Sequence, residues 1–245
     1  MATDLKETKG LFFDVYATLI DWEAGILPQL LELAPSPETP ELKKQLFHAY
    51  HEYQKEIWAS EPTLKYPLVL ERVYARVAQD LGVSFSPDAQ RAFGHSIGEW
   101  PAFPDTVKAL ERLAKHYKLF VLSNVDNESF ERTRRGPLQN AHWDGIYTAE
   151  TIGSYKPDPR NYEYVVEKAA KFGIEKSELL IVAQSLEFDH VMTKKLNFKP
   201  GVWIARGGST MGGHREELEQ EGLIDIAGAY DKLSDFADAV EKAFS

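Results

Sequence analysis

Residues 11–20, LFFDVYATLI, form an apolar run that is interrupted by a single acid, Asp14. The run predicts a buried strand with Asp14 at its carboxyl end. A buried carboxylate with no donor or cation beside it costs several kcal/mol, so such an acid is either held by partners or used in chemistry. The rest of the sequence therefore has to supply the partners of Asp14.

The composition is that of a globular protein: 43% of the 245 residues are hydrophobic, enough for one domain with an insertion or for two modest domains. The net charge of −10 disfavours binding to nucleic acid or anionic lipid. The chain has no cysteine, which excludes disulfides, thiolate zinc sites and cysteine nucleophiles. The N-terminus is polar, and no apolar stretch approaches the about twenty residues of a membrane span. We expect a cytoplasmic protein that acts on a small molecule, without nucleic-acid or membrane partners, and a homodimer is an open option.

After about residue 103 the sequence alternates short apolar runs with longer amphipathic stretches, which is typical of a parallel sheet with crossover helices. Strands are predicted over 118–124, 178–185 and 201–206, and helices over 159–173 and 232–244. The glycine-rich segment 206–213 lacks the lysine of a phosphate-binding loop, so a plain loop is expected there.

Residues 22–99 differ from the rest, because three segments with helical apolar spacing follow one another without a strong strand between them. We therefore predict an α/β fold. Residues 1–21 and 100–245 would form a Rossmann-like parallel sheet core, and residues 22–99 an inserted helical cap. The two prolines of WPAFPD (100–105) predict the hinge back into the core.

Polar residues stand at the ends of the predicted strands and in the loops that follow them. They are Asp14, Ser123, Lys156 in SYKPDPR and Asp189 in QSLEFD. Ligands of open parallel sheets bind at the carboxyl ends of the strands, so we expect these four side chains to meet. A single one of them would be interpreted as a turn former or helix cap. Together they predict an ionic site, in which the lysine keeps a buried carboxylate ionised and nucleophilic.

The segments DVYAT, LSN, YKPD and QSLEFD match, in order and spacing, the four motifs of the haloacid dehalogenase superfamily, and the chain resembles that family over its whole length, cap included. The resemblance implies the fold of that family and a hydrolase with Asp14 as its nucleophile. Thr18 and Ser123 would orient the target of this attack. Lys156 would hold the charge, and Asp189 would anchor the far side of the site.

The residue two positions after the nucleophile distinguishes branches of this family. The phosphatases carry a second aspartate there as general acid, and this chain has Tyr16. An alkoxide that leaves a phosphate ester gains greatly from a proton, whereas a halide is a weak base and leaves without one. The chain therefore resembles the 2-haloacid dehalogenase branch, with Tyr16 at the substrate, although Tyr16 also fits a core aromatic. Ala17 stands where that branch commonly has glycine, a small change that is expected to keep the turn sterically modest.

Three further residues match positions of that branch. Asn124 matches a residue that holds the departing halide, and an amide N–H is a suitable donor to an anion. Tyr162, six positions after Lys156, matches a tyrosine that lines the active site, although its helical spacing also fits packing. Ser185 falls where the branch has an asparagine beside the attacking water, with one extra residue before Asp189.

The cap departs from the bacterial 2-haloacid dehalogenases, which use a cap arginine to grip the substrate carboxylate and the halide. The aligned position here offers Phe47 or His48, and no arginine precedes Arg72. Either another cation supplies the charge from a different angle, or the substrate is not a simple haloacid. The candidate cations are His48, Lys65, Arg72 and Arg76, each of which also fits an ordinary surface charge.

The leading interpretation is a 2-haloacid dehalogenase that converts a small 2-haloalkanoate to the 2-hydroxyacid and halide through an ester on Asp14, with no cofactor. One alternative is a Mg²⁺-dependent small-molecule phosphatase of the same superfamily, with Asp14, the backbone carbonyl of Tyr16 and Asp189 as ligands. Another is a non-catalytic binding protein on the same scaffold.

Overall fold

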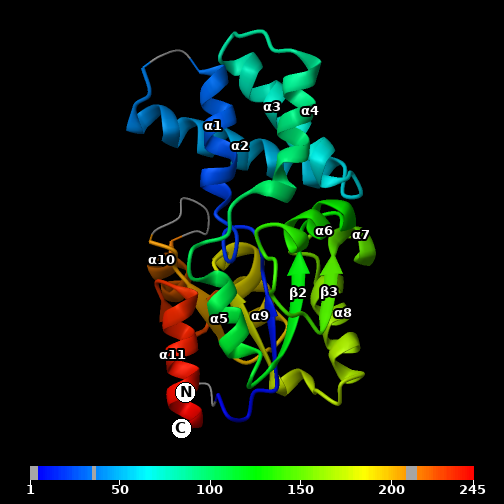
Figure 1. Ribbon diagram of the computed structural model, residues 1–245, viewed down its shortest axis with the longest axis vertical. Coiled ribbons are helices and arrows are strands. Elements are labelled where there is room, and N and C mark those ends of the chain that lie inside the picture. The colour runs from blue at the N-terminus through cyan, green and yellow to red at the C-terminus, as the bar shows by residue number, and fades with distance from the viewer. Residues whose placement is uncertain (1–4, 35–36, 208–213) are drawn as a thin grey trace.

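The structure is a computed structural model that describes residues 5–34, 37–207 and 214–245 (Figure 1). Its centre is a six-stranded sheet in the order β3-β2-β1-β4-β5-β6, and every pair of neighbouring strands runs parallel. The strands are β1 (Gly10–Phe13), β2 (Lys118–Ser123), β3 (Gly145–Thr148), β4 (Leu179–Ala183), β5 (Gly201–Ile204) and β6 (Ile226–Tyr230). The predicted parallel α/β core is confirmed.

The central strands are apolar runs because both faces of the sheet are covered. Every residue of β1 and β4 is buried. Alternate residues of β1 enter different cores, since Leu11 and Phe13 belong to one hydrophobic cluster and Phe12 to another. The predicted strands 118–124, 178–185 and 201–206 correspond to β2, β4 and β5.

The two edge strands, β3 and β6, were not predicted from the sequence. Strand β3 is half buried, and no residue of β6 is fully buried. The continuous apolar run that identifies a central strand is therefore absent from both. They join the sheet because β2 and β5 each offer them a free edge.

Outside the cap, helices alternate with the strands along the chain, as expected for a parallel sheet. Those outside the cap are α5 (Thr106–Leu113), α6 (Asn127–Arg135), α7 (Ala149–Ile152), α8 (Pro159–Ala170), α9 (Val191–Lys195), α10 (Arg215–Gln220) and α11 (Leu233–Phe244). Two short turns, η2 (Lys176–Glu178) and the π-helical η3 (Leu186–His190), flank β4. The helices predicted over 159–173 and 232–244 are α8 and α11.

The segment 22–99 is mainly helical, with short loops between its helices, and no described residue within it belongs to a named strand. It contains α1 (Trp22–Leu33), α2 (Pro40–Ser60), α3 (Tyr66–Asp80), α4 (Pro87–His95) and the 3₁₀ turn η1 (Ser96–Glu99). Figure 1 shows these helices gathered beyond the arrowheads of β2 and β3, at the end of the molecule opposite to both termini. We call this segment the cap; its exact limits as a domain stay a prediction.

The two chain crossings between the sheet and the cap lie side by side. Ile20 forms an antiparallel bridge with Ala102, and the Asp21 amide donates to the Pro101 carbonyl at 2.8 Å. The predicted hinge segment 100–105 is therefore paired with the strand-end loop that carries Asp14. The predicted loop 206–213 lies outside the described residues from 208 onward. Within the described residues, no helix has the length and apolar character needed to cross a membrane.

Candidate active site

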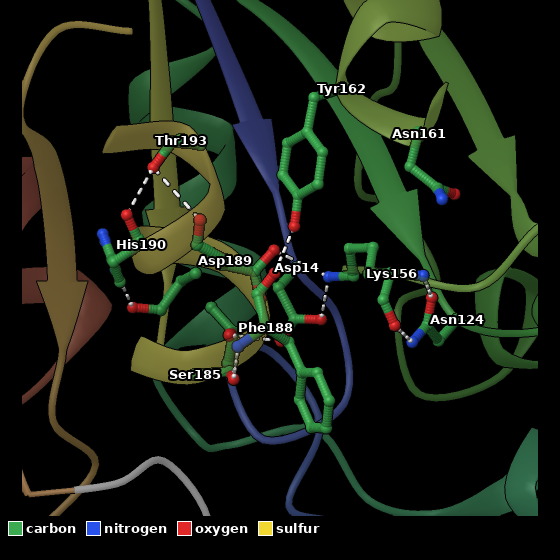
Figure 2. Close-up of polar contacts among 12 residues, drawn as sticks. Asp14, Asn124, Lys156, Asn161, Tyr162, Ser185, Phe188, Asp189, His190 and Thr193 are labelled. Atoms are coloured by element: carbon green, nitrogen blue, oxygen red, sulfur yellow. Dashed lines mark hydrogen bonds and ion pairs between the residues drawn. The ribbon is translucent and has the colours of Figure 1, made fainter. Parts of the chain in front are cut away.

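The four predicted strand-end residues meet at one point. Asp14 follows β1, Ser123 ends β2, Lys156 lies in the loop before α8, and Asp189 lies in η3 after β4. Because β1 is central and pairs with both β2 and β4, these carboxyl ends share one edge of the sheet. Figure 2 shows the Lys156 ammonium group between the carboxylates of Asp14 and Asp189.

The Asp14 carboxylate has a partner on each oxygen. The Thr18 hydroxyl donates to Asp14 Oδ2 at 2.7 Å, and Lys156 Nζ lies 2.9 Å from Asp14 Oδ1. Thr18 Oγ1 also accepts a hydrogen bond from the Gln184 amide at 2.8 Å, which ties the turn after β1 to the end of β4. The acid that the apolar run buries is therefore held by both a hydroxyl and a cation.

Lys156 bridges two buried carboxylates. Its Nζ lies 2.8 Å from Asp189 Oδ1 as well, and its side chain is 2% exposed. Burial opposes the ammonium form, but the charges of Asp14 and Asp189 prevail and raise the pKa of Lys156. Burial raises the pKa of Asp189 to about 7, and Asp189 Oδ2 has no hydrogen-bond partner among the described residues.

The turn after Asp14 is strained at Ala17. Its φ of +86° lies in the left-handed region that favours glycine. Alanine is a small replacement for glycine, but its Cβ atom still disfavours this backbone conformation.

Ser123 and Asn124 have different environments. Ser123 is 2% exposed, and its hydroxyl has no hydrogen-bond partner among the described residues. The Asn124 amide is paired with the backbone of Lys156: its Nδ2 donates to the Lys156 carbonyl at 3.0 Å, and its Oδ1 accepts from the Lys156 amide at 2.6 Å. Asn124 therefore fixes the loop that carries the lysine, and one Nδ2 proton remains for a ligand.

Tyr16 combines the two interpretations that the sequence left open. It lines the cavity described below, while its hydroxyl pairs with Thr133 Oγ1 at 2.9 Å and its ring packs edge-on against Trp100. Burial raises the pKa of Tyr16 far above its usual value, so the phenol keeps its proton.

Tyr162 and Ser185 both contact the η3 turn. The Tyr162 hydroxyl donates to the Phe188 carbonyl, and its ring belongs to a hydrophobic core cluster rather than to the cavity wall. Ser185 lines the cavity, and its Oγ accepts from the Phe188 amide at 3.1 Å. Between Ser185 and α9 the chain forms a π-helical turn, which holds more residues than an α-helical one.

A cavity of about 60 Å³ opens beside Asp14, with room for roughly four to six water-sized groups. The strand ends and η3 form one wall. Four cap residues form the opposite wall: His51, Gln54, Trp58 and Tyr66. A small molecule that reaches Asp14 would therefore be enclosed between the sheet and the cap.

The cationic residues predicted to replace the cap arginine lie elsewhere. Lys65 pairs with Glu150 at 2.8 Å, Arg76 with Glu56 at 2.6 Å, and Arg72 with Glu61. His48 is exposed, and none of these four side chains lines the cavity.

Phe47, the other residue at the aligned position, is buried against Trp22. The cap residues that do face Asp14, His51 and Gln54, were missed. They lie one and two helical turns beyond Phe47 on α2, and this i, i+4, i+7 spacing is the signal that could have identified them.

The phosphatase alternative assigns Asp14, the backbone carbonyl of Tyr16 and Asp189 to a metal. Lys156 Nζ already bridges Asp14 and Asp189, so an ammonium group stands between the two carboxylates that would hold Mg²⁺. Among the described residues, no three histidine or acidic side chains gather as a ligand set.

The chain is similar to known proteins in sequence and in fold. A family model described as haloacid dehalogenase-like hydrolase matches residues 8–186. The (S)-2-haloacid dehalogenase H-109 of Pseudomonas putida is 24% identical over 209 residues, which cover 84% of this chain and 89% of that protein.

Two solved structures share the fold. The L-2-haloacid dehalogenase from Xanthobacter autotrophicus superposes with a TM-score of 0.75 at 17% identity, covering 96% of this chain and 98% of that one. The same enzyme with chloropropionic acid covalently bound gives a TM-score of 0.74 at 17% identity, with the same coverage.

Proposed function

The chain belongs to the haloacid dehalogenase-like hydrolases, and we propose that it is a 2-haloacid dehalogenase, which converts a small 2-haloalkanoate to the 2-hydroxyacid and halide. The single observation that carries this proposal is the pairing of Asp14 with Lys156 at 2.9 Å beside a small cavity, with Tyr16 in place of a second acid. The (S)-2-haloacid dehalogenases among its relatives support the same choice of substrate class.

In the first step, an oxygen of Asp14 attacks C2 of the substrate, the carbon–halogen bond breaks, and the halide leaves with the bonding electron pair. Lys156 pairs with the Asp14 carboxylate, and Thr18 fixes the orientation of that carboxylate. The unpaired Ser123 hydroxyl and the remaining Asn124 proton are donors for the substrate carboxylate and the departing halide. The product of this step is an ester between Asp14 and C2.

The halide requires no proton, so this step needs no general acid two positions after Asp14. The Tyr16 phenol, which keeps its proton and pairs with Thr133, serves as a wall of the cavity in this proposal.

In the second step, water attacks the carbonyl carbon of the ester and releases the 2-hydroxyacid. Asp189 is the base in this step, because it is the only other buried carboxylate that contacts Lys156 in the described chain and its Oδ2 is free of other partners. A pKa of about 7 is suited to accepting a proton from water near neutral pH.

A single turnover in ¹⁸O-water tests this route. Attack at the ester carbonyl places the solvent oxygen in Asp14 first, so mass spectrometry should find ¹⁸O in the peptide that contains Asp14 and not in the first 2-hydroxyacid released. Heavy oxygen in that first product would contradict the covalent route. Turnover should also survive a chelator, whereas a magnesium-dependent phosphatase would lose its activity.

We propose a cytoplasmic enzyme, in line with its lack of cysteine, and a homodimer. Fractionation of the source cells and light scattering of the purified protein test the two proposals.

A further inference from the structure

The cap wall of the cavity contains a buried polar group that the proposed reaction does not use. Gln54, Tyr50 and Tyr66 are 1%, 1% and 5% exposed, among aromatic side chains of the cap core. The Gln54 Nε2 group donates to the Tyr50 hydroxyl at 3.1 Å and to the Tyr66 hydroxyl, and the two hydroxyls lie 3.0 Å apart. We call these three residues the cap triad.

The cap triad is not satisfied by its own members. Gln54 Oε1 is buried and finds no hydrogen-bond donor among the described residues. Burial raises the pKa of both tyrosines, so both phenols keep their protons. One phenol proton is used between Tyr50 and Tyr66, and one is left over. The triad therefore carries one spare acceptor and one spare donor.

The side chain that carries the unpaired acceptor belongs to the cavity wall. Gln54 and Tyr66 line the cavity, and Tyr50 does not. A buried acceptor without a donor costs free energy, and apolar side chains of similar shape would pack there without that cost. The cap retains polar groups at the point where it faces Asp14, which points to a ligand that supplies the missing partner.

The chemistry of the spare groups identifies that partner. A halide offers no donor and would repel Gln54 Oε1, an alkyl group offers neither donor nor acceptor, and an ammonium group only donates. A hydroxyl both donates and accepts, so it can donate to Gln54 Oε1 and accept from Tyr66.

We propose that the cap triad recognises a hydroxyl group on C3 of the substrate, so that the preferred substrates are 2-halo-3-hydroxyalkanoates and the products are 2,3-dihydroxyalkanoates. This inference rests on the proposed dehalogenase function. With the carboxylate on the sheet side near Ser123 and Lys156, and C2 at Asp14, the C3 group faces the cap. Gln54 is then a specificity-determining residue.

Two chlorinated acids with equal numbers of non-hydrogen atoms test the proposal: 2-chloro-3-hydroxypropanoate and 2-chlorobutanoate. Chloride release should give a kcat/KM ratio in favour of the hydroxylated acid of about 100-fold or more, because a site built to bind a hydroxyl rejects the analogue that lacks it. Gln54→Leu should bring this ratio close to one.

Gln90→Leu is the matched control, because Gln90 is a cap glutamine that bonds the Glu71 carbonyl, away from the cavity. It should keep the wild-type ratio. If Gln54→Leu does not fold, Tyr66→Phe removes only the hydroxyl and should lower the ratio as well.

A wild-type ratio near or below one overturns the proposal, as does a ratio that Gln54→Leu leaves unchanged. If the enzyme releases chloride from 2-chloropropanoate and 2-chlorobutanoate but does not prefer the hydroxylated acid, the role of the cap triad is disproved. The proposed dehalogenase function is then still supported. No chloride from any of the three acids removes both.

Discussion

Lys156 Nζ lies 2.9 Å from Asp14 Oδ1, and the two side chains are 2% and 11% exposed. The ammonium group also contacts Asp189, so it compensates two carboxylates at once. This arrangement explains how an acid can end a buried strand: the cation is supplied by a loop 142 positions further along the chain.

Replacing Lys156 by methionine tests this compensation. Lys156→Met leaves Asp14 and Asp189 close together without a counter-charge, so the free energy of unfolding should fall by about 3–5 kcal/mol at pH 7.5. Halide release should fall by at least about 100-fold, because the charge that orients the nucleophile is gone. Urea titration and a halide assay measure the two effects.

The matched control for Lys156→Met is Lys65→Met, which removes a cap lysine from an exposed pair with Glu150. It should leave the urea midpoint of unfolding close to that of the wild type, because an exposed ion pair contributes little to stability. Wild-type halide release by Lys156→Met would disprove the role of the lysine in holding Asp14.

The pH dependence of the second step follows from Asp189. Burial raises its pKa to about 7, so the base is ionised above that pH and protonated below it. Hydrolysis of the ester should rise with pH and level off above about 8, and fall about tenfold per pH unit below about 6. At pH 5.5, rapid-quench experiments should show one fast halide per enzyme followed by slow turnover.

Asp189→Asn should reproduce the low-pH behaviour at every pH, with the ester on Asp14 detectable by mass spectrometry of the intact protein. A steady-state rate that is flat between pH 5.5 and 8.5 in the wild type would exclude Asp189 as the base.

The positions of Asp14, Ser123, Lys156 and Asp189 could be predicted because one rule covers them: parallel strands end at one edge of the sheet. The cap residues that line the cavity could not be predicted in this way. Helix α2 is amphipathic. The orientation of the cap on the core, which the hinge determines, decides which residues of α2 lie near Asp14. His51 and Gln54 therefore had no sequence signal as clear as a strand end.

Charge was a misleading guide in the cap. Lys65 and Arg76 were candidates to replace the cap arginine because they are cations. Each of them pairs with a glutamate away from the cavity. The neutral Gln54 has the more informative environment, because the burial of its Oε1 atom without a donor is visible only in three dimensions. The edge strands β3 and β6 were missed for a related reason, since half-exposed strands lose the apolar run that identifies buried ones.

Because the backbone at Ala17 is strained, we expect that replacing this residue by glycine changes the stability of the fold very little. Ala17→Gly relieves a left-handed conformation, at φ +86°, that costs alanine about 1–2 kcal/mol. It also loses about 1 kcal/mol of methyl burial and increases the entropy of the unfolded chain by a similar amount. The free energy of unfolding should therefore change by less than about 1 kcal/mol.

Ala109→Gly is the control for Ala17→Gly, because Ala109 is equally buried but lies in helix α5. It should cost about 2 kcal/mol in the same urea titration, from helix propensity and lost burial together. Equal losses in the two variants would show that the turn after Asp14 is not strained.

The buried side chain of His190 should make the free energy of unfolding depend on pH in the acid range. It is 1% exposed, its Nε2 lies 3.2 Å from the Ala183 carbonyl, and its Nδ1 has no partner among the described residues. Burial lowers its pKa from 6.5 to about 4, so the imidazole stays neutral in the folded protein when it is already protonated in the unfolded chain. Between pH 6.5 and 4 the unfolded state binds more protons at this residue, and stability falls as the pH falls.

His190→Gln removes this titration while keeping a donor for the Ala183 carbonyl. The free energy of unfolding should be lower than that of the wild type at pH 7.5, and the difference should shrink by up to about 3 kcal/mol on going to pH 4.5. Asp189, whose raised pKa makes stability fall with rising pH over an overlapping range, is present in both proteins, so the difference isolates His190. His142→Gln, at an exposed histidine, should keep the wild-type slope. Parallel pH profiles for the wild type and His190→Gln would mean that the buried imidazole is not neutral in the folded state.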